Sequence, residues 1–112
     1  MKVYVAGPIS KGDRQANYDQ AVAACHELIR AGIAVYCPHL FMMTHIDNVP
    51  REETDPEHLK KLMINDFEWI KVCDVMLRLP GESVGADEEV AYAESLGIPI
   101  FSSTTEVIEA VR

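Results

Sequence analysis

The chain has 112 residues, which is the length of a single domain and enough to enclose one hydrophobic core. Its 48% of hydrophobic and 25% of charged residues are typical of an ordinary globular protein and exclude a disordered or fibrous one. The net charge of −8 excludes an extended nucleic-acid surface, because phosphates are neutralised by clustered Lys and Arg, and the 10 basic residues are scattered.

The start of the chain predicts a protein that is neither exported nor bound to a membrane. Its apolar run covers only residues 3–7, which is too short for a signal peptide, and no stretch approaches the length that spans a membrane. The three cysteines stand at spacings of no known motif: Cys25, Cys37 and Cys73. We expect a cytoplasmic protein whose thiols are reduced and fill small buried sites.

Strands and helices are predicted to alternate from the first residues onward. Residues 3–6 are a short apolar run stopped by Gly7 and Pro8, which indicates a buried strand. Residues 14–30 are expected to form a helix that Gly32 closes. Its inner positions are expected to be Ala21, Cys25, Leu28 and Ile29.

A second strand and a long connection follow. Residues 33–37 are apolar, whereas residues 38–56 mix prolines with polar side chains and are predicted to be a loop. So long a loop in a small domain is usually functional or mobile. The next helix is expected to run from Pro56, with Asp55 as its N-cap, to about residue 72.

The remaining elements continue the alternation. The last two strands are expected at residues 74–79 and 98–101, and the last two helices at residues 85–96 and 105–111. Because short apolar strands joined by helical crossovers make a parallel sheet, we predict a three-layer α/β domain, flavodoxin-like or Rossmann-like, with four to five strands. Ligands of such domains bind beyond the carboxyl ends of the strands, which here are followed by residues 7–12, 38–43 and 80–85.

Two acidic residues fall where apolar side chains belong. Asp66 lies on the inner stripe of its helix, which is marked by Leu59, Leu62, Met63 and Ile70. Glu89 lies on the inner face of the next helix, which is marked by Ala86, Val90, Ala93 and Leu96. A buried carboxylate needs either a partner, for which Arg78 is a candidate, or a function. Two such acids near strand ends favour a functional site.

Paired carboxylates are the groups that cleave glycosidic bonds, one as nucleophile or base and the other as acid. Glu89 stands near the start of its helix, where the positive end of the helix dipole is expected to keep a nucleophile anionic. The amides of the same helix start could hold part of an anionic substrate.

Several segments resemble one enzyme family. The likeness spans the chain from residue 3 to about residue 100, in residues 3–10 (VYVAGPIS), 66–70 (DFEWI), 73–75 (CDV) and 83–85 (SVG), followed by Glu89. These segments resemble the nucleoside 2-deoxyribosyltransferase superfamily, and especially its 2′-deoxynucleoside 5′-phosphate N-hydrolases and their small bacterial and phage relatives. The specific part of the likeness is the separation of Asp66, Asp74, Ser83 and Glu89.

The resemblance implies a role for each matching residue. Glu89 would be the nucleophile at the anomeric carbon, Asp66 the partner that orients or protonates the nucleobase, and Tyr4 the group that positions the sugar and the nucleophile. The substrate-binding residues would lie in the strand-end loops: Gly7, Ile9, Ser10 and Gly12 around the sugar and its 5′ end, and Ser83, with Gly85 beside it, at a 5′-phosphate. Residues 1–112 would form a single nucleoside deoxyribosyltransferase-like domain.

The chain departs from the N-hydrolase pattern in two places. Residues 8–12 (PISKG) stand where the hydrolases have Ser-Ile-Arg-Gly-Gly, so the 5′-phosphate preference stays open, with Lys11 or Arg14 as replacement cations. Asp87 stands where the family usually has a second glycine. Its negative charge would weaken anion binding at this helix start.

Simpler structural roles compete with the functional ones. A buried tyrosine such as Tyr4 is more often a packing residue with one hydrogen bond. Gly7 belongs to an ordinary turn signal, and Ser83 can serve as a helix cap. Trp69 is expected to pack on the flank of its helix, and Asp74 at a strand start is interpreted as structural.

The histidines suggest a metal site only weakly. Cys37, His39, His45 and His58 fit none of the usual zinc spacings, so we expect no metal ion and no cofactor. His39 and His45 would more readily line a nucleobase pocket. Phe41, Met42 and Met43 are expected to pack the loop onto the core rather than to cover a base.

Two functions stay open on the sequence alone. The first is cleavage of the N-glycosidic bond of a nucleoside or nucleoside 5′-monophosphate, completed by water or by transfer to another base. The alternative is a non-catalytic nucleotide-binding or sensor module that uses the same pocket. In both cases the partner is a small-molecule nucleoside or nucleotide, with no nucleic acid and no membrane, and family precedent implies a homo-oligomer with sites shared across an interface.

Overall fold

The computed structural model describes residues 1–42 and 56–111. Its strands are β1 (Lys2–Ala6), β2 (Ala34–Tyr36), β3 (Val75–Arg78) and β4 (Ile100–Phe101). Its helices are α1 (Arg14–Arg30), α2 (His39–Met42), α3 (Pro56–Ile70), α4 (Val84–Ser95) and α5 (Thr104–Val111). Within these described ranges, no helix is long and apolar enough to cross a membrane.

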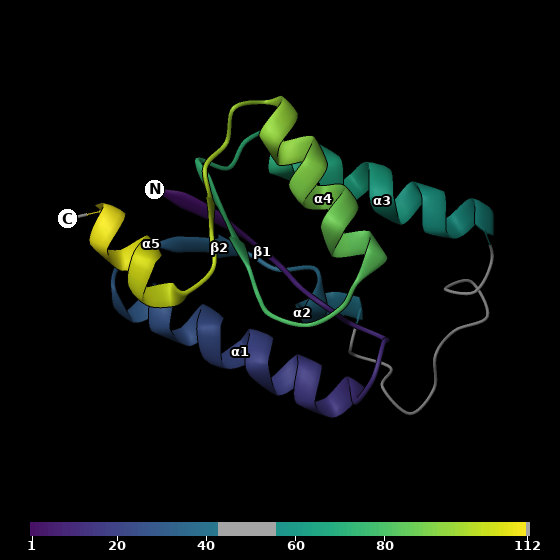
Figure 1. The fold of residues 1–112 in the computed structure, drawn as a ribbon, viewed down its shortest axis with the longest axis horizontal. Coiled ribbons are helices and arrows are strands. Elements are labelled where there is room, and N and C mark those ends of the chain that lie inside the picture. The colour runs from purple at the N-terminus through teal and green to yellow at the C-terminus, as the bar shows by residue number, and fades with distance from the viewer. Residues whose placement is uncertain (43–55, 112) are drawn as a thin grey trace.

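The four strands form one parallel sheet in the order β2-β1-β3-β4, which confirms the predicted fold class. Helices α1 and α5 cover one face of the sheet, and α3 and α4 cover the other (Figure 1). Strand β1 is central, with Val3 opposite both Val35 of β2 and Val75 of β3. The loops that follow β1 and β3 therefore begin side by side at one edge of the sheet.

Alternation along β1 divides its side chains between two cores. Val3 and Val5 belong to the core beneath α1 and α5. Tyr4 and Ala6 belong to the core beneath α3 and α4, together with Met76 of β3. Because successive strand residues point to opposite faces, Tyr4 is directed to the layer that carries the two inward acids.

Two side chains that were expected on inner helix faces are exposed instead. Ile29 is 53% exposed and Leu96 is 46% exposed. At about 100° per residue, Ile29 lies about 80° around α1 from Ala21, at the margin of the buried stripe. Leu96 is the C-cap of α4, where the chain leaves the helix and no longer follows its inner face.

The connection after β2 is not a loop throughout. Helix α2 begins at His39, inside the range predicted to be a loop, and Pro38 directly precedes it. The expected N-cap, Asp55, lies outside the described residues, as do Met43 and His45.

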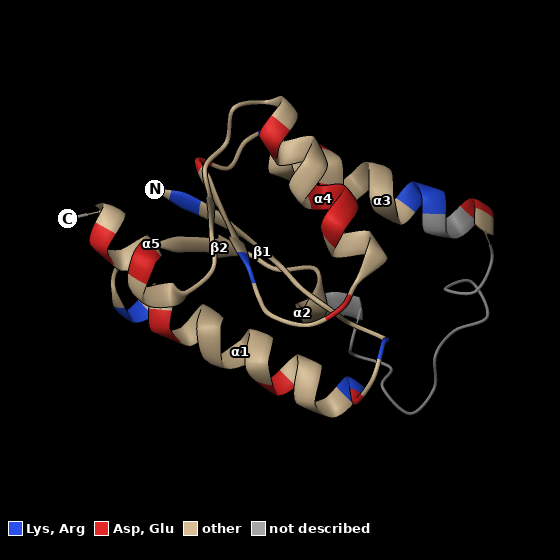
Figure 2. Cartoon of the chain, in the orientation of Figure 1, with Lys and Arg blue, Asp and Glu red and all other residues tan. Residues whose placement is uncertain are grey.

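Polarity follows the layers of the fold. Charged residues lie mainly on the helices and loops, whereas the strands are mostly uncharged (Figure 2). Cys25, Cys37 and Cys73 are all free and buried, which confirms the expected interior sites.

Candidate active site

The site is centred on a contact between β1 and α4. Tyr4 is fully buried, and its hydroxyl donates a hydrogen bond to Oε2 of Glu89. Glu89 is 7% exposed and follows Ala86 on the inner face of α4. Burial, assisted by the charges of Glu89 and Asp66, raises the pKa of Tyr4, so its phenol stays a neutral donor. The fold thus holds one carboxylate oxygen of Glu89 in a fixed direction.

The surroundings of Glu89 favour its protonated form. Burial raises the pKa of Glu89 to about 7, and the charge of Asp66 acts in the same direction. The hydrogen bond from Tyr4 and the charge of Arg78 lower the pKa without cancelling the effect of burial. The expectation that the helix dipole keeps Glu89 anionic is therefore wrong. The dipole acts within the first turn of a helix, and Glu89 is the sixth residue of α4.

Asp66 is the second buried acid of the same layer. It lies in α3 and is 8% exposed. Burial raises the pKa of Asp66 to about 6, although a hydrogen bond with Asn65 lowers it. The charges of Asp66 and Glu89 both raise the pKa of Tyr4 and that of Tyr36. The two acids predicted from the sequence are thus buried and converge on the same pair of phenols.

Arg78 does not form the ion pair with either acid that the sequence left open. Its guanidinium pairs with Asp87, at 3.1 Å between Nη2 and Oδ1. Among the described residues, neither Asp66 nor Glu89 has an ion-pair partner. A buried carboxyl without a counter-ion has a raised pKa, as both acids do, and can take a ligand as its partner.

Tyr36 is a member of the site that the sequence analysis did not identify. Its ring lies 5.5 Å from that of Tyr4 at 31°, and it stacks on Trp69 at 5.0 Å and 13°. Its hydroxyl accepts a hydrogen bond from Nδ2 of Asn65, at 3.1 Å. The sequence contains no signal for it, because its place beside Tyr4 depends on the β1–β2 register, in which the two tyrosines are opposite each other. Trp69 packs as expected, yet it remains 47% exposed beside the acids' layer.

The loop after β1 carries four residues that the resemblance assigns to the sugar. Gly7 is buried, and an added Cβ there would lie 2.9 Å from Cβ of Leu79, so this glycine is needed for close packing of the two segments. Ile9 is half-buried, whereas Ser10 and Gly12 are exposed. The structure therefore places these residues in one loop at the sheet edge, with Gly7 having a packing role of its own.

This loop is fixed by hydrogen bonds to its backbone carbonyls. Nδ2 of Asn17 donates to the oxygens of Ile9 and Lys11, at 3.1 and 2.8 Å. Nε2 of His39 lies 2.8 Å from the oxygen of Pro8, so it carries the proton of the neutral ring. Nδ1 of His39 then accepts from the Cys37 thiol, at 3.4 Å.

The expectation that His39 lines a nucleobase pocket is not supported. The side chain is 1% exposed, and both ring nitrogens have partners within the protein. Burial lowers the pKa of His39, which keeps the ring neutral. Among the described residues, no group of three or more His, Cys, Asp or Glu side chains could hold a metal ion. His45 and the side chains of Phe41, Met42 and His58 lie outside the described part of the chain.

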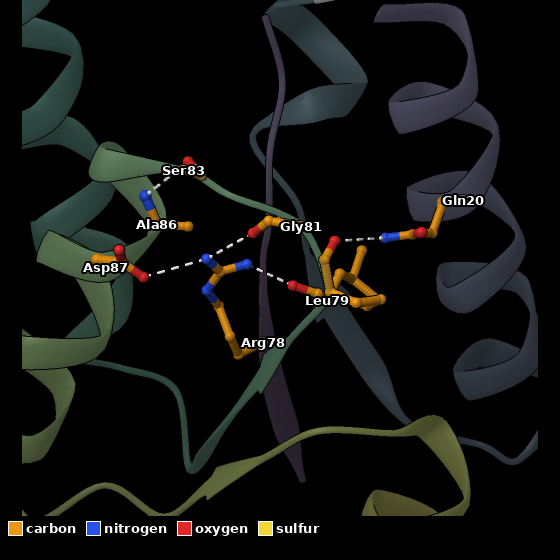
Figure 3. Close-up of polar contacts among 8 residues, drawn as sticks. Gln20, Arg78, Leu79, Gly81, Ser83, Ala86 and Asp87 are labelled. Carbon is orange, nitrogen blue, oxygen red and sulfur yellow. Dashed lines mark hydrogen bonds and ion pairs between the residues drawn. The ribbon is translucent and has the colours of Figure 1, made fainter. Parts of the chain in front are cut away.

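The loop between β3 and α4 faces the first loop. Oγ of Ser83 accepts from the amide of Ala86 at 3.1 Å, so Ser83 is the N-cap of α4 (Figure 3). Gly85 has room around it, since the nearest atom to an added Cβ would be Cε of Met63 at 3.9 Å. The two loops are bridged by an ion pair of 3.0 Å between Lys11 and Glu82.

The arrangement offers defined acid–base chemistry. Two buried carboxyl groups with pKa values of about 6 and 7 exchange protons near neutral pH, where general acid–base groups work best. One of them is oriented by a phenol, and an aromatic stack with an exposed tryptophan lies next to them. These groups suit a small organic substrate that contains an aromatic ring.

The chain matches the model of a family described as a domain of unknown function, DUF7768, over residues 1–103. No curated protein matches the chain. One similar solved structure is a 2-deoxyribosyltransferase from the psychrotolerant bacterium Bacillus psychrosaccharolyticus, with 22% identity and a TM-score of 0.65. The similarity covers 89% of this chain and 69% of that one. At this level of identity, the likeness shows a shared fold.

Proposed function

We propose that this chain, which belongs to the DUF7768 family, cleaves the N-glycosidic bond of a nucleoside or nucleoside 5′-monophosphate with Glu89 as the nucleophile. One observation carries the proposal: the Tyr4 hydroxyl holds the buried carboxyl of Glu89 on the sheet face that a second buried acid, Asp66, also faces. Residues 1–112 would act as a single nucleoside deoxyribosyltransferase-like domain.

The proposed first step transfers the sugar to the enzyme. Tyr4 holds Oε2 of Glu89, which leaves Oε1 to attack the anomeric carbon. A carbon–oxygen bond forms as the carbon–nitrogen bond to the base breaks, through a transition state that resembles an oxocarbenium ion. The bonding electrons leave with the base, and the product is an ester between the sugar and Glu89.

Asp66 would assist the departure of the base. The base leaves more readily if its nitrogen gains a proton, and a carboxyl with a pKa of about 6 can supply one near neutral pH. The reactive form has Glu89 ionised and Asp66 protonated. Positive charge develops on the sugar during the reaction. It stabilises the carboxylate of Glu89, which is the acid next to the anomeric carbon, and so favours this protonation state.

The second step would release the sugar. Water attacks the anomeric carbon of the ester, transfers a proton to Asp66 and restores the Glu89 carboxylate, which gives hydrolysis. A second nucleobase in place of water gives transfer instead. The solved protein that shares this fold is a 2-deoxyribosyltransferase, which supports the transfer outcome.

Release of free base provides the direct test. The protein is incubated with a panel of ribonucleosides, deoxyribonucleosides and their 5′-monophosphates, with and without an acceptor base, and products are separated by chromatography. Glu89→Gln should lower release by at least about a thousandfold, because the amide is a poor nucleophile. Glu94→Gln is the matched control, since Glu94 is an exposed residue of the same helix.

The outcomes separate the candidates. Release that survives in Glu89→Gln would remove Glu89 from the mechanism. Ligands that raise the melting temperature without any release of base would favour the non-catalytic sensor. Products that appear only with an acceptor base would identify a transferase rather than a hydrolase.

A further inference from the structure

Arg78 occupies an unusual place for a cation. It is the last residue of β3 and lies opposite Ala6 of β1. Two residues earlier in the strand, Met76 packs in the core beneath α3 and α4 with Tyr4 and Ala6. The alternation of the strand therefore directs Arg78 to the same face, and its side chain is only 19% exposed.

The guanidinium of Arg78 connects three parts of the loop that leads into α4 (Figure 3). Nη1 donates to the oxygen of Leu79, and Nη2 donates to the oxygen of Gly81 at 2.9 Å. Nη2 also pairs with Asp87 in the first turn of α4, at 3.1 Å. The planar fork of arginine matches such a set of acceptors, which a lysine ammonium could not span.

The contacts with the backbone matter more than the ion pair. The Asp87 side chain is 71% exposed, and exposed pairs contribute about 0–1 kcal/mol. By contrast, two carbonyl groups of a tight turn depend on Arg78 for a donor, and on the other side of the loop Nε2 of Gln20 donates to Pro80 at 3.4 Å. The loop is thus held from both sides before Ser83 starts the helix.

We propose that Arg78 is a positioning residue for the candidate site: it fixes the loop from which α4 starts and presents a cation to Glu89 on that helix. The proposal rests on the function proposed above for Glu89. It assigns no contact with the substrate to Arg78, which acts through the placement and the charge of another residue.

The charges around Glu89 predict the direction in which its pKa changes when Arg78 is replaced. The groups whose hydrogen bond or charge changes the pKa of this carboxyl are the Tyr4 hydroxyl from β1, Asp66 from α3, the exposed Glu88 from α4 and Arg78 from β3. Arg78 is the cation in this set and lowers the pKa of Glu89, whereas both acids raise it. Removing Arg78 should therefore raise the pKa of Glu89 above its present value of about 7.

The test compares two substitutions that separate charge from shape. Arg78→Met keeps the aliphatic stem without the charge. Because the reactive form has Glu89 ionised and Asp66 protonated, the basic limb of the kcat/KM profile reports the higher pKa, that of Glu89, and this limb should move up by about one pH unit. Arg78→Lys keeps the charge without the fork, so the limb should stay in place while kcat falls roughly five- to tenfold because one ammonium cannot hold both carbonyls. Arg30→Met, at the exposed end of α1, is the control and should change neither.

Two results would overturn the proposal. An unmoved limb in folded Arg78→Met would show that the cation does not act on Glu89, and full activity of Arg78→Lys would show that the fork does not position the loop. If Arg78→Met does not fold, Asp87→Asn replaces it. Arg78 would then be less neutralised, so the limb should move to lower pH, and a limb at or above the wild-type position rejects the proposal.

A titration of the Glu89 carboxyl by carbon-detected NMR separates this inference from the proposed function. It requires no turnover. If the wild-type protein releases no base, an upward change of the Glu89 pKa in Arg78→Met still supports the role of Arg78. An unchanged pKa in that titration rejects the role, whatever reaction the protein catalyses.

Discussion

At the scale of single residues, the site consists of two carboxyl groups whose pKa values the folded protein raises. The pKa of Glu89 rises from its ordinary value of 4.5 to about 7, and that of Asp66 rises from 3.8 to about 6. Folding therefore favours the protonated forms. These contributions to stability are fully present below about pH 4 and are lost as the pH rises through 6 to 7.

The first prediction concerns Glu89→Gln, whose amide resembles the protonated acid at every pH. The variant and the wild type should have similar stability near pH 4, where the wild-type carboxyl is neutral. Above pH 7 the variant should be more stable by about 3 kcal/mol, because each pKa unit corresponds to about 1.4 kcal/mol. Urea unfolding at pH 4.5 and pH 8 measures the difference, and an equal gap at both pH values would contradict it.

The second prediction concerns the hydroxyl of Tyr4. Tyr4→Phe keeps the buried ring and removes the hydrogen bond that lowers the pKa of Glu89. We expect base release to fall roughly 10- to 100-fold, and the basic limb of the kcat/KM profile, which reports the higher pKa of Glu89, to move to higher pH. Tyr18→Phe on α1 is the control. Wild-type kinetics in Tyr4→Phe would leave Tyr4 with a packing role alone.

At the scale of elements, the β1–α1 and β3–α4 loops lie at one edge of the sheet and approach each other closely. Gly81 has a φ of +117° and lies against Pro8, where an added Cβ would be 2.8 Å from Cγ. The contact joins the β3–α4 loop to the β1–α1 loop. The geometry around Arg78 therefore also depends on a position that only glycine tolerates.

The third prediction compares two glycines with positive φ. Gly81→Ala should destabilise the protein by about 2–4 kcal/mol, because the new methyl group meets Pro8 in a backbone conformation that disfavours side chains. Gly12→Ala has a φ of +79° and open space within 4 Å, so it should cost about 1 kcal/mol. Thermal unfolding of both variants measures the ranking. Equal losses would show that the contact with Pro8 adds nothing.

At the scale of the whole molecule, the net charge of −8 acts on any charged substrate. Cations near the two loops are partly neutralised, since Lys11 pairs with Glu82 and Arg78 pairs with Asp87. A phosphate that approaches this side therefore meets no net positive field from these pairs. Long-range repulsion of this kind is reduced by salt, because the Debye length is about 10 Å at 0.1 M.

The fourth prediction follows from that field. Raising the ionic strength from 20 to 200 mM should lower the KM for a nucleoside 5′-monophosphate by roughly two- to fivefold. The KM for the matching uncharged nucleoside should not change, which makes it the internal control. A monophosphate KM that increases with salt would instead indicate a local cationic site, for which Arg14 and Lys11 are the candidates.

The homo-oligomer and the cytoplasmic location stay predictions, because a single chain tests neither. The same holds for the roles that the resemblance assigns to Ser10 and Gly12, which the structure places in the first loop without assigning them a contact. Ser83 is confirmed as a helix cap, while its proposed contact with a phosphate remains a prediction.

The sequence alone determined the order and the approximate limits of nearly every element, because helical and strand periodicity are local properties of a chain. The expected helix at residues 14–30 coincides with α1, and the other elements differ mainly at their ends. The same periodicity identified Glu89 and Asp66, since an acid on an apolar stripe can be recognised without knowing what it faces. Helix α2 was missed because a single turn carries too little pattern.

Which side chains contact one another depends on the tertiary structure. The order of the strands brings Tyr36 beside Tyr4, takes Arg78 to Asp87 rather than to a buried acid, and closes both nitrogens of His39 within the protein. The raised pKa of Glu89 was equally hidden, because burial and neighbouring charges depend on residues far apart in the chain. Local spacing encodes which face a side chain takes, whereas contacts across the sheet depend on how all the elements pack together.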